Sequence, residues 1–180
     1  HELHVLLTGE RDGYYADFGS IDGLLRELHR REPERLVACA QNHDQVGNRA
    51  FGDRPPPDAH RVALAVVLFA TTTPLVFMGE EYDEARPFQF FTDHPDPETA
   101  EATRRGRREE FARFESFSAA DIPDPQDPAT FERSKLRPGP ADPLGRELLE
   151  LRRELPRDLE ATADGRRVTL RRGATELVAD

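Results

Sequence analysis

Short apolar runs alternate with polar segments along the first half of the chain. Residues 36–40 (LVACA) form an apolar run that stops abruptly at the polar residues 41–45. A run of this length is typical of a strand buried on both faces. Residues 60–70 are apolar almost all round, and their length and alanines favour a buried helix, which Pro74 is expected to end. Residues 75–78 then predict a second short strand.

The order strand, loop, helix, strand predicts a βαβ unit of the α/β class with two parallel strands and a right-handed crossover. Parallel strands have their carboxyl ends on the same side of a sheet. The polar segments QNHDQ (41–45) and GEEYDE (79–84) are therefore expected at one rim, where α/β folds place their chemistry.

The remaining elements follow from periodicity and from capping residues. Helical spacing and the N-cap Ser20 predict a helix over 21–29, and a charged helix is expected around 98–114. Asp142 and Pro143 indicate the cap and first residue of another helix. Alternation in 167–171, the turn at Gly173 and the return over 175–179 predict a hairpin, the opening of a small β domain.

The polar cluster after the first strand is the leading candidate site. Ionised Asp44 only accepts hydrogen bonds, whereas His43 and Asn42 donate and accept, as does Gln41. This set suits a polyhydroxylated ligand such as a sugar. The alternative is structural, because Asx residues routinely cap helices and close turns.

Glu80 and Glu81 follow the second strand and are candidate substrate contacts, or simply a solvated strand end. The loop beyond them is rich in aromatic residues. Such rings either stack on sugar faces or form a small core beneath a long loop. The residues concerned are Tyr82, Phe88, Phe90 and Phe91.

Composition removes several function classes. The 180 residues carry a formal net charge of −10, which argues against a nucleic-acid or anionic-membrane partner. Arginines 104, 105, 107 and 108 cluster between glutamates, which indicates a solvated helix face. The lone Cys39 excludes a disulfide framework and fits the cytoplasm. No apolar stretch is long enough to cross a bilayer.

Four segments resemble the malto-oligosyltrehalose trehalohydrolases of the α-amylase superfamily, and the first of them contains the Asn-His-Asp strand end of that superfamily. The resemblance covers most of residues 2–136. The segments are QNHDQVGNRAFGDR (41–54), LLTGERDGYYADFG (6–19), TPLVFMGEEYDEARPFQFFTDH (73–94) and DPQDPATFERSKL (124–136).

The resemblance implies a TIM (β/α)₈ barrel in which residues 36–40 and 75–78 are strands seven and eight. It implies retaining hydrolysis of the α-1,4 bond beside the terminal trehalose unit of malto-oligosyl trehalose or a related α-glucan, without metal or organic cofactor. Asp44 matches the carboxylate that stabilises the transition state, and His43 matches a histidine that donates to the same sugar. Gln41, Asn42, Glu80, Glu81 and Phe88 are the expected substrate contacts.

The family's nucleophile and acid/base carboxyls have no counterpart here. Retaining hydrolysis needs such a pair about 5–5.5 Å apart, and a whole barrel needs about 250 residues. The chain is therefore expected to be a C-terminal part, with barrel over 1–160 and a truncated β domain over 161–180, inactive and poorly soluble by itself. The alternatives are a non-catalytic, carbohydrate-binding remnant, or a divalent-metal site formed by His43, Asp44, Glu80 and Glu81.

Overall fold

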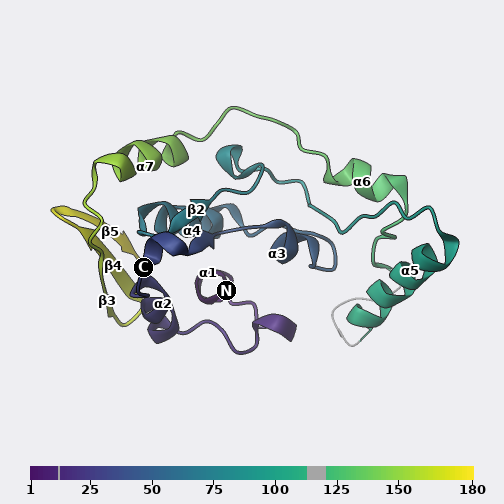
Figure 1. Cartoon of the computed structure of the whole chain (residues 1–180), viewed down its shortest axis with the longest axis horizontal. Helices are drawn as coiled ribbons and strands as arrows, with labels where there is room; N and C mark the ends of the chain where they lie inside the picture. The colour runs from purple at the N-terminus through teal and green to yellow at the C-terminus, as the bar shows by residue number, and fades with distance from the viewer. Residues whose placement is uncertain (12, 113–120) are drawn as a thin grey trace. The chain divides into compact units, whose positions relative to one another are not determined.

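Helices joined by long loops make up most of the structure, with two small sheets (Figure 1). The computed structural model describes residues 1–11, 13–112 and 121–180. The α-helices are α1 (Glu2–Thr8), α2 (Ile21–Leu28), α3 (His43–Gly47), α4 (Pro57–Phe69), α5 (Pro97–Phe111), α6 (Pro128–Ser134) and α7 (Pro143–Glu154). The 3₁₀ helices are η1 (Gly13–Tyr15), η2 (Pro33–Arg35) and η3 (Glu80–Tyr82). The strands are β1 (Val37–Cys39), β2 (Thr73–Leu75), β3 (Glu160–Asp164), β4 (Arg167–Arg172) and β5 (Thr175–Ala179).

These elements divide between two compact units. The first, here called the sheet unit, comprises residues 1–40, 55–83 and 140–180. The second, the α3 unit, comprises residues 41–54 and 84–139. The boundary predicted at residue 160 follows a different criterion, the start of a β domain, and stays a prediction.

The sheet unit contains the βαβ arrangement expected from the apolar runs. β1 and β2 are parallel, with Val37 opposite Thr73 and Cys39 opposite Leu75. The connecting helix α4 is the predicted buried helix, although it begins at Pro57 and ends at Phe69, before Pro74. Both strands are three residues long. Because they run parallel and their last residues, Cys39 and Leu75, are paired, their carboxyl ends lie at the same edge of the sheet.

Two expectations about these strands are wrong. Pro74 does not end the helix: it lies inside β2, which is shifted towards the N-terminus from the expected 75–78. An edge strand tolerates proline because one side of its backbone needs no ladder hydrogen bond. β1 is not buried on both faces either, since Val37 is 65% exposed. A two-stranded sheet covers only part of the apolar surface of each strand.

The main hydrophobic core joins α2, α4 and the second sheet. Leu24, Val66, Phe69 and Leu170 are buried there, and leucines from α1 pack against them. The predicted hairpin is confirmed, because β4 and β5 are antiparallel with Arg172 opposite Thr175. β3 adds a strand that the pattern did not predict, and the resulting sheet lies beside α2 (Figure 1).

Several helix starts share one signature, a Pro at the first helical position after a capping residue that accepts a first-turn amide. This is the pattern expected at Asp142 and Pro143, and it is confirmed there. The cap Ser20 is confirmed as well, and its hydroxyl accepts from Gly23 at 2.9 Å. The three Asp caps accept as follows: Asp96 from Thr99 (2.8 Å), Asp127 from Ala129 (2.9 Å) and Asp142 from Leu144 (2.9 Å).

The α3 unit consists of α3, α5, α6 and the long loop from Glu84 to Asp96. The charged helix predicted over 98–114 is α5, which starts at Pro97; its expected end at Phe114 lies outside the described residues. Among the described residues, no helix is long and apolar enough to cross a membrane.

Candidate functional site

The polar cluster at 41–45 is not a plain loop, because a short helix begins inside it. Asn42 caps α3, and its Oδ1 accepts a hydrogen bond from the Gln45 amide at 2.7 Å. Asn42 therefore has the capping role that Asx residues often have, and its expected contact with substrate stays a prediction. Asn42 followed three residues later by Gln45 matches the spacing of a capping box, a signal that predicts this helix from sequence.

His43 and Asp44 occupy the first turn of α3. His43 Nε2 lies 3.3 Å from Asp44 Oδ1, and their side chains are 73% and 71% exposed, respectively. An exposed carboxylate beside an imidazole offers hydrogen-bond acceptors and a donor to the same ligand. These two side chains are therefore accessible and suited to sugar hydroxyls.

Gln41 has a different environment from its neighbours. It is 3% exposed, and its Oε1 accepts a hydrogen bond from Arg54 Nη1 at 3.1 Å. Arg54 also donates from Nε to the carbonyl of Arg86 at 3.0 Å. Gln41 thus ties the start of α3 to the aromatic loop, and its expected contact with substrate stays a prediction.

Phe88 lies directly against α3. A Cβ added at Gly47 would be 3.6 Å from the Phe88 ring, and one added at Gly52 would be only 2.4 Å from the Phe88 carbonyl oxygen. The Phe88 amide donates to the Gly52 carbonyl at 2.7 Å. Gly52 has φ +66°, a conformation that favours glycine. The expected sugar platform is therefore held beside the helix that carries Asp44.

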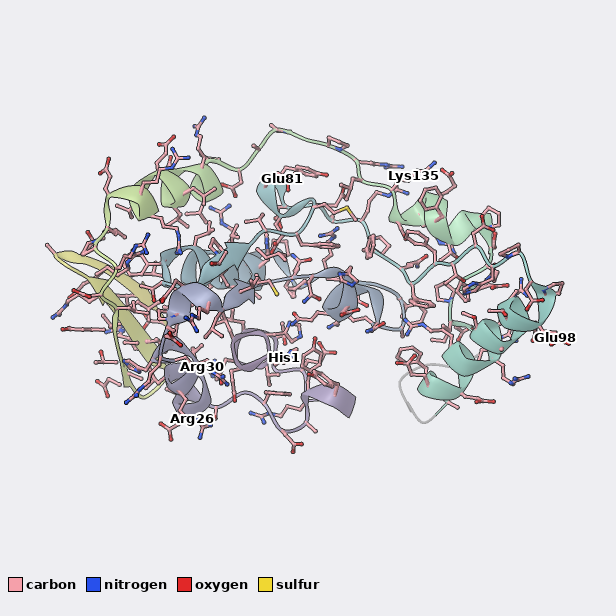
Figure 2. The ribbon with its side chains drawn as sticks, viewed as in Figure 1. His1, Arg26, Arg30, Glu81, Glu98 and Lys135 are labelled. Carbon is pink, nitrogen blue, oxygen red and sulfur yellow. The ribbon has the colours of Figure 1, made fainter. Side chains whose placement is uncertain are left out.

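The other aromatic residues of this loop form part of a small cluster. The ring centroids of Phe88 and Phe91 are 5.8 Å apart, and those of Phe91 and Phe131 are 5.0 Å apart. Lys135 Nζ lies 4.8 Å from the Phe131 ring at the end of α6 (Figure 2). Phe88 and Phe91 pack on neighbouring rings and are half-buried, as expected of a small core beneath a loop, whereas stacking on a sugar stays a prediction.

Arg107 departs from the solvated helix face predicted for the α5 arginines. It is 7% exposed, while Arg105 and Arg108 are exposed. Its guanidinium donates to three main-chain carbonyls at the end of α3 and to Glu110. Burial lowers the pKa of Arg107, and the charge of Glu110 opposes that shift. The i, i+3, i+4 pattern of charges does not reveal which arginine turns inward.

Glu80 is buried in the sheet unit rather than exposed at a rim. It is 2% exposed; its Oε1 lies 3.0 Å from His60 Nε2 and its Oε2 accepts from the Phe77 amide at 2.5 Å. His60 Nδ1 lies 3.2 Å from Asp83 Oδ1. A substrate contact by Glu80 would require its side chain to leave both partners.

The groups around His60 shift its pKa in opposite directions. Burial alone would lower the pKa of His60, but the hydrogen bonds and charges of Glu80 and Asp83 outweigh it and raise that pKa. Two carboxylates facing both ring nitrogens favour the imidazolium, which donates from both. His60 is not among the residues predicted from sequence, although a single titratable residue inside an apolar helix is a usable signal.

Glu81 is exposed in η3 (Figure 2), and its Oε2 accepts from the Gly79 amide at 2.8 Å. It belongs to the sheet unit, as does Glu80, whereas residues 41–45 and Phe88 belong to the α3 unit. The shared rim of the two polar segments accordingly stays a prediction. Within residues 1–11, 13–112 and 121–180, no three His, Cys, Asp or Glu side chains are grouped to hold a metal ion.

Comparison with known proteins finds relatives that share one name. Malto-oligosyltrehalose trehalohydrolase of Arthrobacter ramosus is 45% identical over 196 aligned positions, covering 89% of this chain and 34% of the relative. The protein of the same name from Mycobacterium tuberculosis is 43% identical over 164 positions, covering 76% of this chain and 28% of the relative. The chain thus spans about a third of the length of the curated relatives it matches. No family model matches.

A solved structure gives the same result for the fold. The crystal structure of a putative alpha amylase from Salmonella typhimurium superposes with a TM-score of 0.74 at 33% sequence identity. The superposition covers 98% of this chain and 38% of that protein. The expected fold class, a portion of an α-amylase-type barrel protein, is confirmed.

Proposed function

Because this chain belongs to the malto-oligosyltrehalose trehalohydrolase family, we propose that it is the part of a retaining glycoside hydrolase that carries the transition-state-stabilising carboxylate. The substrate is malto-oligosyl trehalose, cleaved at the α-1,4 bond beside its terminal trehalose unit. The observation that carries the proposal is the exposed pair His43 and Asp44 at the start of α3, directly after β1.

The chemistry assigned to this pair is electrostatic. Cleavage of a glycosidic bond builds positive charge on the sugar ring, and a preorganised carboxylate stabilises that charge. Asp44 accepts hydrogen bonds from sugar hydroxyls, and His43 donates to the same sugar. Phe88, held against α3, offers a ring face to the substrate.

The nucleophile and the acid/base carboxyl lie, in this proposal, on barrel strands that precede the matched segment. Retaining hydrolysis places these two carboxyls about 5–5.5 Å apart on either side of the bond. This chain alone is therefore expected to release no trehalose. A cytoplasmic location is part of the proposal and rests on the single Cys39 and on the family.

The proposal is tested by Asp44→Asn in the full-length protein that carries this chain, with Asp93→Asn as the control. Asp93 is exposed in the same unit. Trehalose release from malto-oligosyl trehalose should fall by about 10²–10³-fold in Asp44→Asn, with unchanged thermal stability, because Asn keeps the shape and loses the charge. Asp93→Asn should match the parent protein. Near-parental turnover of Asp44→Asn would overturn the proposal and favour a carbohydrate-binding piece.

A further inference from the structure

Arg107 is a buried cation whose hydrogen bonds converge on the end of one short helix. Its Nη2 donates to the carbonyls of Gly47 (3.0 Å) and Arg49 (2.7 Å), and its Nη1 donates to that of Asn48 (3.3 Å). The last carbonyls of a helix have no partner within it. Arg107, sixty residues from Gly47 in sequence, supplies partners for three consecutive carbonyls here.

Asn48 links the hydrogen bonds of Arg107 to the main chain of Asp44. The Asn48 amide donates to the Asp44 carbonyl at 2.9 Å, while the Asn48 carbonyl accepts from Arg107. At the other end of α3, Asn42 caps the helix. α3 has only five residues, too few to be stable alone. The hydrogen bonds at its two ends therefore help to hold α3 in place, together with the packing of Phe88 against it.

The surroundings of Arg107 hold its guanidinium in one orientation. The guanidinium carbon lies 4.6 Å from the ring centre of Phe111 and 5.1 Å from that of Phe90. Glu110 Oε2 accepts from Nη1 at 2.8 Å. A planar guanidinium that lies over two rings and is paired with a carboxylate can donate to several carbonyls at once, whereas a lysine ammonium is a single point charge.

We propose that Arg107 is a positioning residue for Asp44, which it orients by fixing the carboxyl end of α3. This inference rests on the proposed function, in which Asp44 stabilises the transition state. It assigns to α5 a role in turnover, through the three hydrogen bonds from Arg107 to the end of α3. Arg107 itself does not touch substrate in this proposal.

The experiment uses the full-length protein that carries this chain and the variants Arg107→Lys and Arg107→Met. Arg108→Lys is the matched control, because Arg108 is the neighbouring, exposed arginine of α5. Arg107→Lys should lower kcat by about 10–100-fold, measured well below its melting temperature, with KM changed by less than about threefold. Arg108→Lys should leave both constants unchanged.

A double-mutant cycle separates positioning from general destabilisation. If Arg107 acts through Asp44, Arg107→Lys should cost little further turnover once Asp44 is Asn. Equal losses in both backgrounds, or parental kcat in Arg107→Lys, would overturn the inference while the proposed function stands. Parental kcat in Asp44→Asn itself would instead overturn the proposed function. Arg107→Met tests whether the protein needs Arg107 in order to fold. If that variant gives no soluble protein, the cycle with Arg107→Lys decides the inference.

Discussion

His60 and Glu80 form a buried ion pair that fastens η3 to helix α4, with Nε2 and Oε1 3.0 Å apart. Asp83 engages the other ring nitrogen, so the imidazole is held from both sides. The carboxyl end of β2 is joined to η3 by residues 76–79. This pair therefore fixes the backbone of the polar segment 79–84, which contains the predicted substrate contacts Glu80 and Glu81.

The pH dependence of stability tests this pair. The pKa of His60 is raised in the folded protein, so its stabilisation is fully present below the unfolded value and is lost as pH rises through the folded value. In the full-length protein, His60→Gln should cost about 3 kcal/mol near pH 6 and less near pH 9. Thermal unfolding of the parent protein and of His60→Gln, measured between about pH 6 and pH 9, gives this difference in stability. His29→Gln, at an exposed site, is the control: the difference in stability between this variant and the parent protein should be the same near pH 6 and near pH 9.

Gly52 is predicted to be irreplaceable, and Gly47 replaceable, although both lie beside Phe88. A Cβ at Gly52 meets the Phe88 carbonyl at 2.4 Å, and its φ is +66°, so Gly52→Ala should cost about 3 kcal/mol. Gly47→Ala makes an ordinary contact at 3.6 Å and gains about 0.5–1 kcal/mol of helix propensity. In the full-length protein, Gly52→Ala should lower the melting temperature and raise KM for malto-oligosyl trehalose. Equal behaviour of the two variants would contradict this geometry.

Arg172 is expected to be a major stabilising residue of the sheet unit. It is 3% exposed and donates to the carbonyls of Phe69 (3.0 Å), Pro156 (2.7 Å) and Leu155 (3.3 Å). Arg172→Met leaves these carbonyls without that donor and should cost about 3 kcal/mol of unfolding free energy. Arg171→Met, which removes solvent-exposed ion pairs with Glu176 and Glu160, should cost at most about 0.5 kcal/mol. Urea unfolding of the two variants in the full-length protein distinguishes them.

The sequence predicts best where apolar residues are continuous. β1 and α4 follow from such runs, whereas β2 begins two residues before the run that predicted it. The hairpin follows from strict alternation around Gly173. β3 was missed because Ala161 is its single buried residue, so Glu160–Asp164 shows no apolar face. The pattern does not reveal α3, because its cap Asn42 and the polar residues after it also suit a ligand-binding loop.

The site is predictable in part for the same reason. Local chemistry identifies His43 and Asp44, which the structure leaves exposed. It does not identify Arg107, because the partner carbonyls lie about sixty residues away and the neighbouring arginines carry the same charge. Nor does it show that Glu80 is buried, since its partner His60 is twenty residues away in a separate element.

The isolated chain should fold poorly. β1, β2 and the segment that follows β2 leave apolar side chains uncovered: Val37 is 65%, Leu75 39%, Val76 40% and Met78 41% exposed. Exposed apolar surface on a two-stranded sheet with open edges favours association and a fluctuating core. The 180-residue chain should bind a hydrophobic dye and lose near-ultraviolet circular dichroism, with no cooperative melting. Val37→Lys should raise its solubility without restoring cooperativity, because it removes apolar surface but adds no packing partner. A sharp thermal transition of a monomer would show instead that the α4-centred core suffices.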